Sequence, residues 1–455
     1  MNRLASARGL LLFALFNVQL VGVAGAAESS ASESWKKQQR VAAEKSEGIL
    51  KQADRVRGLL GQYQLMLAAY KADESKAFRL IFGQYLSWHQ TYVGLYDEAV
   101  ESFSIKQEAD KQDAPSPLEG GQYSAQPAVD AIAKLAHGRR AIFFNEAHNA
   151  AITRSLTVQM LGKLREDGYT WFAAETLYET DTALTKRGYP IDKSGFYTQE
   201  PVYADMIRSA LKLGFKVVSY EAMSDATGDG REREQARNLY ERVFKTDPQA
   251  RLVVNAGYAH IVESGKYLGG ASMAQHFRKL SDIDPLTIEQ TMLIEHPQPN
   301  QDHPIYRAVV ASHNPSVPTV FIDKMGKPWS LRPAGYDVSV LFPASPHDPK
   351  NRPAWLSLGG LRKSYAIGGE ICRGELPCLI EARYPDEDDD AIPADRTVLG
   401  LADPHASEDE HKFVSASRLR GELYLRPGRY RVRGVNSENH ALTSQNITVS
   451  ASNSP

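Results

Sequence analysis

Imidazoles and carboxylates recur in this sequence directly after short apolar segments. Imidazole titrates near neutral pH, so a histidine beside a carboxylate is suited to acid–base chemistry or to metal binding. Glu146 and His148 are two residues apart, which places both side chains on the same side of an extended segment. Further polar residues follow other apolar segments. They are Glu175 after residues 170–174, Tyr220 and Glu221 at the end of 216–220, Asn255 at the end of 251–255, and Tyr258 and His260 shortly after it.

The region from residue 124 to about 345 must position these side chains. It alternates apolar runs with helical patterns, which predicts a mostly parallel sheet with helices on both faces. Parallel strands bring their carboxyl ends to one edge, where α/β folds bind ligands. We therefore expect one shared polar site at that edge. The predicted strands are 140–144, 170–174, 216–220 and 251–255, and the predicted helices are 150–165, 200–213 and 230–244.

Two regions of different character flank this α/β domain. Residues 27–123 combine a helical pattern with a polar linker at 109–123, and the helices are a candidate homodimer interface. Residues 350–455 lack helical patterns and contain a hairpin pattern at 422–433 and a last strand at 447–449. The expected fold is thus an α/β domain, preceded by an α-helical region and followed by a small β-rich domain.

The composition narrows the functional classes. The chain has 53 basic and 55 acidic residues, so it lacks the positive field that attracts nucleic acid. It contains no G-x-S-x-G, H-E-x-x-H, G-x-x-x-x-G-K-[ST] or G-x-G-x-x-G motif, which leaves a serine elbow, a zincin site, a P-loop and a dinucleotide fingerprint without support. With nucleic acid excluded, we expect the binding partner to be a small-molecule or peptide substrate.

Residues 1–26 have the pattern of a secretory signal peptide. Arg3 and Arg8 precede an apolar core at 10–23, and Ala24-Gly25-Ala26 forms an A-x-A cleavage site. We expect an exported protein, periplasmic or secreted, with no stable membrane span after cleavage; an uncleaved anchor is the alternative. In an oxidising compartment, Cys372 and Cys378 are expected to form a disulfide, with two free thiols as the alternative.

Short motifs in the α/β region follow a recognisable order. They are FFNEAHN at 143–149, EPV at 200–202, VSYE at 218–221, REREQARN at 231–238 and VVNAGYAHI at 253–261. The first is similar to the G-E-x-H opening motif of ChaN-like proteins, and the others are similar to segments of the erythromycin esterase family. Over roughly residues 135–295, the chain therefore resembles the broad group that contains the erythromycin esterase, ChaN, TraB and Tiki families.

The sequence departs from this group at the first motif. Asn145 stands where glycine is usual, and Glu146 and His148 are two apart, as in ChaN-like members, rather than three apart as in the esterases. Esterases of the group hydrolyse with a histidine base and no required metal, Tiki-like members look like metal-dependent proteases, and ChaN-like members bind haem iron. The resemblance implies the fold and the site. It does not decide whether the protein binds no cofactor, a zinc or manganese ion, or haem.

The resemblance implies a hydrolase that cleaves an ester or an amide, and the residue types allow roles to be assigned. His148 would activate water, and Glu146 or Glu175 would orient its ring. Arg231 would stabilise an oxyanion, and His260 would bind substrate or act as the second acid.

Three further hypotheses remain open from the sequence. In a metal-dependent variant, His148, His260 and Glu146 would hold the ion and leave a position for water. A haem- or metal-binding uptake protein and a non-catalytic binding or scaffold protein are the alternative functions. The residues expected to bind substrate are Tyr220, Glu221, Asn255 and Tyr258.

Overall fold

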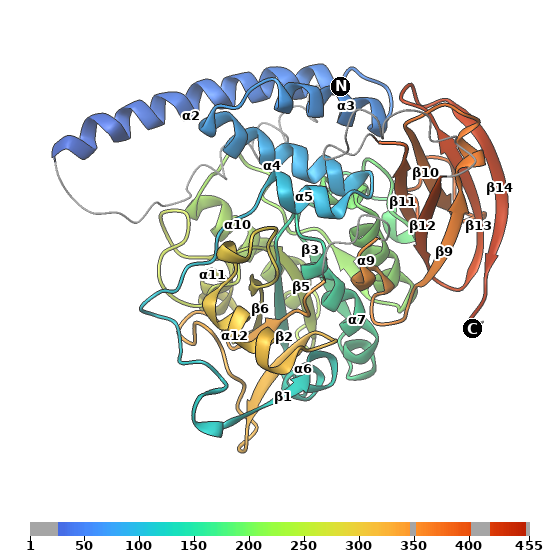
Figure 1. Cartoon of the computed structure of the whole chain (residues 1–455). Helices are drawn as coiled ribbons and strands as arrows, with labels where there is room; N and C mark the ends of the chain where they lie inside the picture. The colour runs from blue at the N-terminus through green and yellow to red at the C-terminus, as the bar shows by residue number, and fades with distance from the viewer. Residues whose placement is uncertain (1–25, 346–351, 402–418, 452–455) are drawn as a thin grey trace.

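The computed structural model describes residues 26–345, 352–401 and 419–451, with side chains from residue 33 onward. The predicted signal peptide lies outside the described residues except for Ala26, which begins the first helix. A large central sheet is flanked by the N-terminal helices on one side and by the C-terminal sheets on another (Figure 1). No helix in the described part of the chain is long and apolar enough to cross a bilayer.

The central sheet has eight strands in the order β1-β7-β8-β6-β2-β5-β3-β4. Its strands from β8 to β4 run parallel, and β7 runs antiparallel to both β1 and β8. The predicted mostly parallel sheet is confirmed. The strands are β1 (Tyr123–Pro127), β2 (Ala141–Glu146), β3 (Trp171–Ala174), β4 (Lys216–Val218), β5 (Leu252–Gly257), β6 (Leu286–Leu293), β7 (Thr319–Asp323) and β8 (Val338–Leu341).

Helices cover both faces of the sheet because its parallel strands are apolar on both sides. Within β2, Ile142 and Phe144 pack against one group of helices, while Ala141 and Phe143 pack against the other. The short helices α8 (Leu184–Arg187) and α12 (Pro304–His313) complete this domain. The first group is α6 (Ala128–Ala136), α7 (Ile152–Glu166) and α9 (Pro201–Lys212), and the second is α10 (Asp229–Leu239), its π-helical extension Tyr240–Phe244 and α11 (Met273–Ser281).

The expected N-terminal helical region is present and packs on the α/β domain (blue in Figure 1). At the contact, the Tyr92 hydroxyl donates to the Phe196 carbonyl at 3.2 Å, and the Tyr96 hydroxyl donates to Glu200 Oε1 at 2.6 Å. Both tyrosines are buried, so this contact is part of the core. The helices are α2 (Ala26–Ala53), α3 (Leu59–Lys71), α4 (Lys76–Tyr92) and α5 (Tyr96–Ser102).

The C-terminal region is β-rich, as expected, and contains two antiparallel sheets. One has the order β11-β10-β13-β14, and the other pairs β12 with β9. The strand expected at 447–449 is the end of β14. The bounds are β9 (Lys363–Gly368), β10 (Cys378–Arg383), β11 (Asp395–Leu399), β12 (Arg420–Leu425), β13 (Gly428–Val435) and β14 (Ala441–Val449).

The hairpin predicted over 422–433 is wrong. β12 pairs with β9, whereas β13 pairs with β10 and β14, so the two segments belong to different sheets. Between them, Pro427 lacks an amide donor and Gly428 takes a φ of 156°, which lets the chain turn out of one sheet and into the other. Leu423 and Val432 then meet in one core between the sheets.

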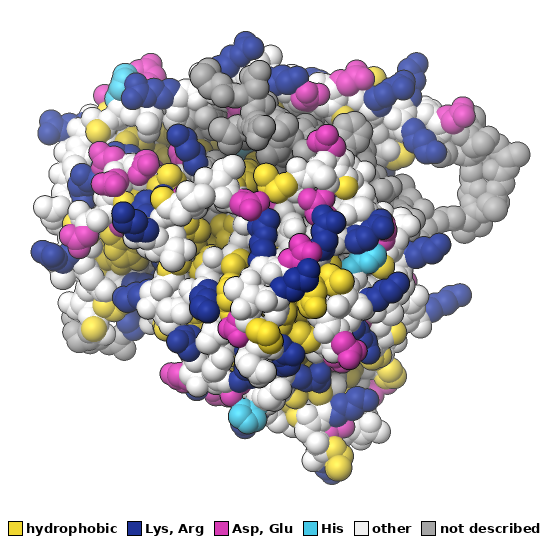
Figure 2. Space-filling view, turned by 180° about the vertical axis from the view of Figure 1, so that it is seen from behind, with side chains coloured by type: hydrophobic (Ala, Val, Ile, Leu, Met, Phe, Trp, Pro, Cys, Tyr) yellow, Lys and Arg dark blue, Asp and Glu magenta, His cyan; other side chains and the backbone are white. Residues whose placement is uncertain are grey.

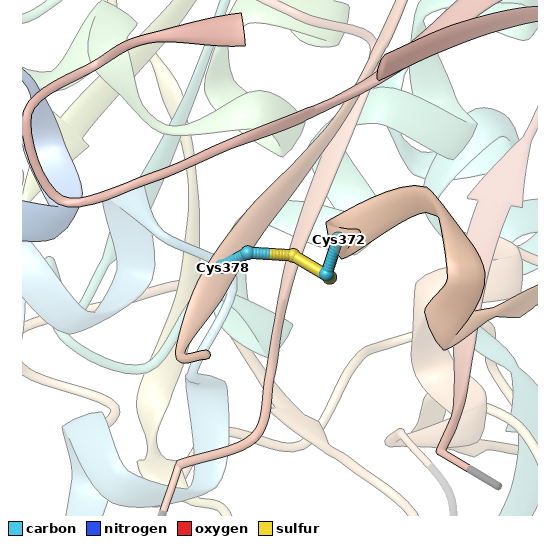
Figure 3. The surroundings of a disulfide bond; sticks show 2 residues. All are labelled: Cys372 and Cys378. Carbon is cyan, nitrogen blue, oxygen red and sulfur yellow. A yellow bond between two sulfur atoms is a disulfide. The ribbon is translucent and has the colours of Figure 1, made fainter. Parts of the chain in front are cut away.

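The predicted disulfide between Cys372 and Cys378 is confirmed (Figure 3). It joins a 3₁₀ turn, Gly369–Cys372, to the first residue of β10, and both cysteines are buried in the core of the C-terminal region.

On the surface, Figure 2 shows basic and acidic side chains interspersed over one face of the molecule, in line with a net charge of −2.

Candidate active site

Four adjacent strands of the central sheet carry the predicted site residues. In the order β2-β5-β3-β4, each strand ends at the same edge because the strands are parallel. Glu146 is the last residue of β2, Glu175 follows β3, Glu221 follows β4 and His260 follows β5. The structure thus brings the side chains that the sequence singled out to one place, and Arg231 joins them from α10.

Glu146 and His148 form a hydrogen-bonded pair in the interior. His148 Nδ1 lies 3.0 Å from Glu146 Oε1, and the His148 and Glu146 side chains are 4% and 1% exposed. Arg154 of α7 donates to Glu146 Oε1 at 2.7 Å and to the His148 carbonyl at 3.1 Å, and the Asn255 amide donates to Glu146 Oε2 at 2.9 Å. A fully partnered carboxylate therefore fixes the orientation of the imidazole.

Aromatic rings enclose His148. Tyr197 stacks on it with the ring centroids 4.0 Å apart, and Tyr258 meets it edge-on at 5.0 Å. Trp88 of α4 approaches at 6.4 Å, so the N-terminal helices form part of the wall. On the remaining side, a Cβ built on Gly257 would overlap the Nε2 edge of the His148 ring, which means that only glycine allows β5 to approach this closely.

Glu175 lies between the two histidines. Its Oε2 is 3.9 Å from His148 Nε2 and accepts the backbone N–H of Gly257 at 2.5 Å. Its Oε1 is 3.4 Å from His260 Nε2 and accepts from Arg231 at 3.1 Å. One carboxylate consequently links the polar ends of β2, β3, β5 and α10.

His260 has a carboxylate beside each ring nitrogen. Nδ1 lies 2.8 Å from Glu232 Oε2, and Nε2 faces Glu175. Burial opposes protonation of the imidazole, but Glu232 and Glu175 outweigh it and raise the pKa of His260 to about 10. His260 is therefore an imidazolium at neutral pH.

Arg231 is held by a second carboxylate. Its Nε and one terminal nitrogen donate to Glu221 Oε1 and Oε2 at 3.0 and 2.9 Å, a bidentate pair. Gln235 also donates to Glu221 Oε1 at 2.9 Å, from one turn further along α10. The other terminal nitrogen of Arg231 lies 3.4 Å from His260 Nε2, so two cations sit side by side among the carboxylates.

The carboxylates of the site are ionised although they are buried. Burial opposes ionisation of Glu175, but His260, His148 and Arg231 outweigh it and hold the pKa of Glu175 well below its ordinary value. Burial likewise opposes ionisation of Glu146, and Arg154 and His148 lower the pKa of that group. The result is a region of paired charge that needs no reorganisation when new charge develops beside it.

All four residues expected to bind substrate hold other protein groups, Tyr258 through its hydroxyl, which donates to Asn149 Oδ1 at 3.3 Å. The Asn255 amide donates to Glu146, the Tyr220 hydroxyl donates to the Asn255 carbonyl at 3.2 Å, and Glu221 holds Arg231. Asn255 and Tyr220 are almost fully buried. Tyr258 differs because its side chain borders a small cavity near His148.

Sequence reasoning missed several members of the site. Glu232 follows Arg231 directly in α10, and Arg154 lies six residues after His148, so both stood close to motifs already singled out. Tyr197 belongs to the 3₁₀ turn Tyr197–Gln199, for which the sequence carries no pattern. Gly257 lies within the last motif, where its steric role depends on how closely β5 approaches His148.

The donor set does not fit a metal ion. Guanidinium groups of Arg231 and Arg154 already occupy the positions beside Glu175 and Glu146 where a cation would bind. Among the described residues, no group of three or more histidine, cysteine or acidic side chains is arranged to hold an ion.

The surroundings of His148 do not fit haem either. An axial imidazole needs room around its free nitrogen for the iron and a whole porphyrin, which is far wider than a water molecule or a single carbonyl group. Here the Nε2 edge of His148 packs against Gly257, and one face of the ring is covered by Tyr197. The smaller cavity beside this site measures about 30 Å³, and the larger one further out measures about 170 Å³.

Comparison with family models and with curated proteins finds no match. Among solved structures, one titled "Crystal structure of bacterial protein toxins" is 16% identical, with a TM-score of 0.29 over 48% of this chain and 46% of that one. The effector domain RRSP of a MARTX toxin from Vibrio vulnificus is 17% identical, with a TM-score of 0.26 over 50% of this chain and 52% of that one. The chain thus aligns with about half the length of either structure.

Proposed function

We propose that the protein is a hydrolase that cleaves an ester or an amide with this cluster of side chains. The observation that carries the proposal is Glu175 between two imidazoles, one oriented by Glu146 and the other held as a cation by Glu232. A general base and a positively charged group close together can each accelerate hydrolysis, the first by activating water and the second by stabilising the oxyanion.

His148 is the general base in this proposal. Its Nδ1–H donates to Glu146, which leaves the lone pair on Nε2. The 3.9 Å between Nε2 and Glu175 Oε2 is too long for a hydrogen bond, so this lone pair remains available to take a proton from water. Glu175 stays ionised and stabilises the imidazolium that forms.

His260 and Arg231 supply the positive charge for the transition state. The water oxygen attacks the carbonyl carbon, its proton passes to His148 Nε2, and the developing oxyanion is stabilised by the two cations. Collapse of the tetrahedral intermediate breaks the C–O or C–N bond, and His148 returns the proton to the leaving oxygen or nitrogen. No step needs a further co-reactant.

The test is hydrolysis of p-nitrophenyl acetate and of fluorescent casein by the purified protein and by His148→Ala. We expect the wild type to cleave at least one of these probes and the variant to lose that activity. His276→Ala is the matched control, because His276 also pairs with a carboxylate, Asp229 at 2.9 Å, but lies outside the cluster. Two outcomes would favour the non-catalytic binding or scaffold alternative. Either His148→Ala retains full turnover, or the wild type cleaves neither probe.

We also propose that the protein is exported to the periplasm or secreted. The pattern of residues 1–26 and the disulfide between Cys372 and Cys378 support this location. Amino-terminal sequencing of protein from the exported fraction is expected to begin at residue 27. A homodimer through the N-terminal helices stays a prediction, which light scattering of the purified protein tests.

A further inference from the structure

Two adjoining cavities lie beside the buried His148. The smaller is lined by Ala147, Asn149 and Tyr258, the immediate neighbours of that histidine. The larger, of about 170 Å³, lies between α5, the start of α7 and the loop at Glu295 and His296, and it shares the last two residues with the smaller one. The two cavities share Val100, Ala150, Glu295 and His296, and the smaller one lies against residues that flank His148.

Carboxylates dominate the polar lining of the larger cavity. They come from Asp97 and Glu101 of α5 and from Glu295, and no lysine or arginine of the described residues lines the space. Glu101 and Glu295 are exposed and therefore lie at the mouth. Partial burial raises the pKa of Glu295, and repulsion from the Asp302 and Asp97 carboxylates adds to this rise. A cation in the cavity would relieve that repulsion.

A buried histidine forms the deeper polar wall. The side chain of His296 is only 5% exposed, and Asp302 Oδ1 accepts both its backbone N–H at 2.7 Å and its Nδ1–H at 3.0 Å. Among the described residues, the bond from Nδ1 to Asp302 is the hydrogen bond that the His296 ring makes. Asp302 thus takes the Nδ1 edge of the ring, and His296 lines both cavities. With the proton on Nδ1, a neutral imidazole accepts a hydrogen bond at Nε2.

We propose that this cavity binds the cationic side chain of the substrate, an ammonium or a guanidinium, and so selects peptides or amides that carry lysine or arginine. This inference rests on the proposed function, since it names the substrate of the same site. The cavity is smaller than the roughly 300–1,000 Å³ of a typical ligand site, so it suits one side chain rather than a whole ligand. Trp355, Pro343 and Ile152 provide apolar walls for the aliphatic stem.

The test measures binding of Nα-acetyl-arginine methylamide by calorimetry, with the citrulline analogue as an uncharged probe of nearly the same shape. We expect the arginine probe to bind at least about tenfold more tightly than the citrulline probe. Replacing both mouth carboxylates, as Glu101→Gln with Glu295→Gln, is expected to weaken binding of the arginine probe by about tenfold and to leave the citrulline probe unchanged.

Two further variants separate this inference from the proposed function. Glu166→Gln removes an exposed carboxylate from the opposite end of α7 and should leave binding unchanged. His148→Ala should also bind the arginine probe with unchanged affinity, even though it cannot hydrolyse ester or amide probes. Equal binding of the two probes, binding of neither, or insensitivity to the double substitution would overturn the cationic site, whatever the outcome of the hydrolysis assays.

Discussion

The edge of the central sheet and the C-terminal sheet each contain a cluster of buried charge, with different partners. Around His148 and His260, carboxylates pair with imidazoles, a type of side chain that can exist with or without its second proton. In the C-terminal sheet, Glu381 meets three guanidiniums, from Arg383 at 3.0 Å, Arg396 at 3.1 Å and Arg433 at 2.8 Å. Guanidinium stays protonated at any working pH, so this second cluster has no proton to exchange.

The remaining contacts of the Glu381 cluster are structural. Arg396 donates to the carbonyls of Tyr92 at 3.1 Å and Gln199 at 2.8 Å, which ties β11 to the end of α4 and to the α/β domain. Burial opposes ionisation of Glu381, but the three arginines lower its pKa to about 2. Burial of charge is thus common to both clusters, and they differ in that the cluster at the sheet edge pairs its carboxylates with imidazoles as well as guanidiniums.

The largest expected difference between the clusters is in catalysis. His148→Ala removes the proposed base, so kcat/KM should fall by about 10²- to 10⁴-fold. Glu381→Gln should leave kcat/KM within about twofold, measured below its unfolding transition, since the Glu381 cluster has no part in the reaction. Steady-state kinetics with whichever probe the wild type cleaves make this comparison. A similar loss in both variants would remove the distinction between the clusters.

Stability should separate the clusters in the opposite sense. Glu381→Gln leaves three buried guanidiniums without their carboxylate, which should lower the free energy of unfolding by about 3–5 kcal/mol. Urea unfolding followed by circular dichroism measures the shift. Glu438→Gln, an exposed carboxylate in the same region, is the control and should change the midpoint little. A small effect of Glu381→Gln would mean that the arginines find other partners.

A substitution without charge tests the geometry of the catalytic edge. In Gly257→Ala the new methyl group would overlap the Nε2 edge of His148, so the ring must move and kcat/KM should fall by roughly 10²-fold. Gly162→Ala is the matched control, because nothing lies within 4 Å of a Cβ at that helical position. It should leave activity unchanged and raise the unfolding midpoint slightly. Full activity of Gly257→Ala would show that the base does not depend on this contact.

The site could be predicted in part because its geometry follows from topology. Glu146, Glu175 and His260 all follow predicted parallel strands, and such strands end on one edge whatever their order in the sheet. Tyr197 and the wall formed by Trp88 could not be predicted, because they depend on how a loop and a distant helix pack over that edge. No periodicity in the chain encodes such packing.

The hairpin predicted in the C-terminal region was wrong for a related reason. Residues 422–433 have the local pattern of a hairpin, with Pro427 and Gly428 between two apolar segments. Their partners, however, are β9 and β10, which lie some forty or more residues earlier in the chain. Local turn chemistry says where a chain turns and not which strand it then joins.

The disulfide extends the comparison to a covalent link in the C-terminal region. Replacing both Cys372 and Cys378 with serine opens a short loop of the unfolded chain, so the free energy of unfolding should fall by about 2 kcal/mol. Because the bridge lies in the core of the C-terminal sheets, kcat/KM should stay unchanged. Urea unfolding with and without reductant provides the measurement. Reductant should shift the wild type and leave the double variant unaffected.

A last expected effect concerns the pH dependence of stability. Folding raises the pKa of His260 from 6.5 to about 10, so its imidazolium stabilises the fold fully below about pH 6.5, and this contribution is lost as the pH rises toward 10. Between about pH 7 and pH 9, the slope is at most about 1.4 kcal/mol per pH unit, and stability falls as the pH rises. His260→Gln should remove this slope, whereas His313→Gln, which removes an exposed imidazole, should retain it.

Glu175 allows a check of the opposite sign. Its pKa is depressed in the folded protein, so its contribution is present above its ordinary range and is lost as the pH falls. Urea midpoints measured across both limbs should therefore define a plateau between about pH 4.5 and pH 6.5, bounded by Glu175 on the acid side and by His260 on the alkaline side. A plateau that His260→Gln leaves unchanged on the alkaline side would mean that His260 is neutral in the fold, and the proposed oxyanion stabilisation would then rest on Arg231 alone.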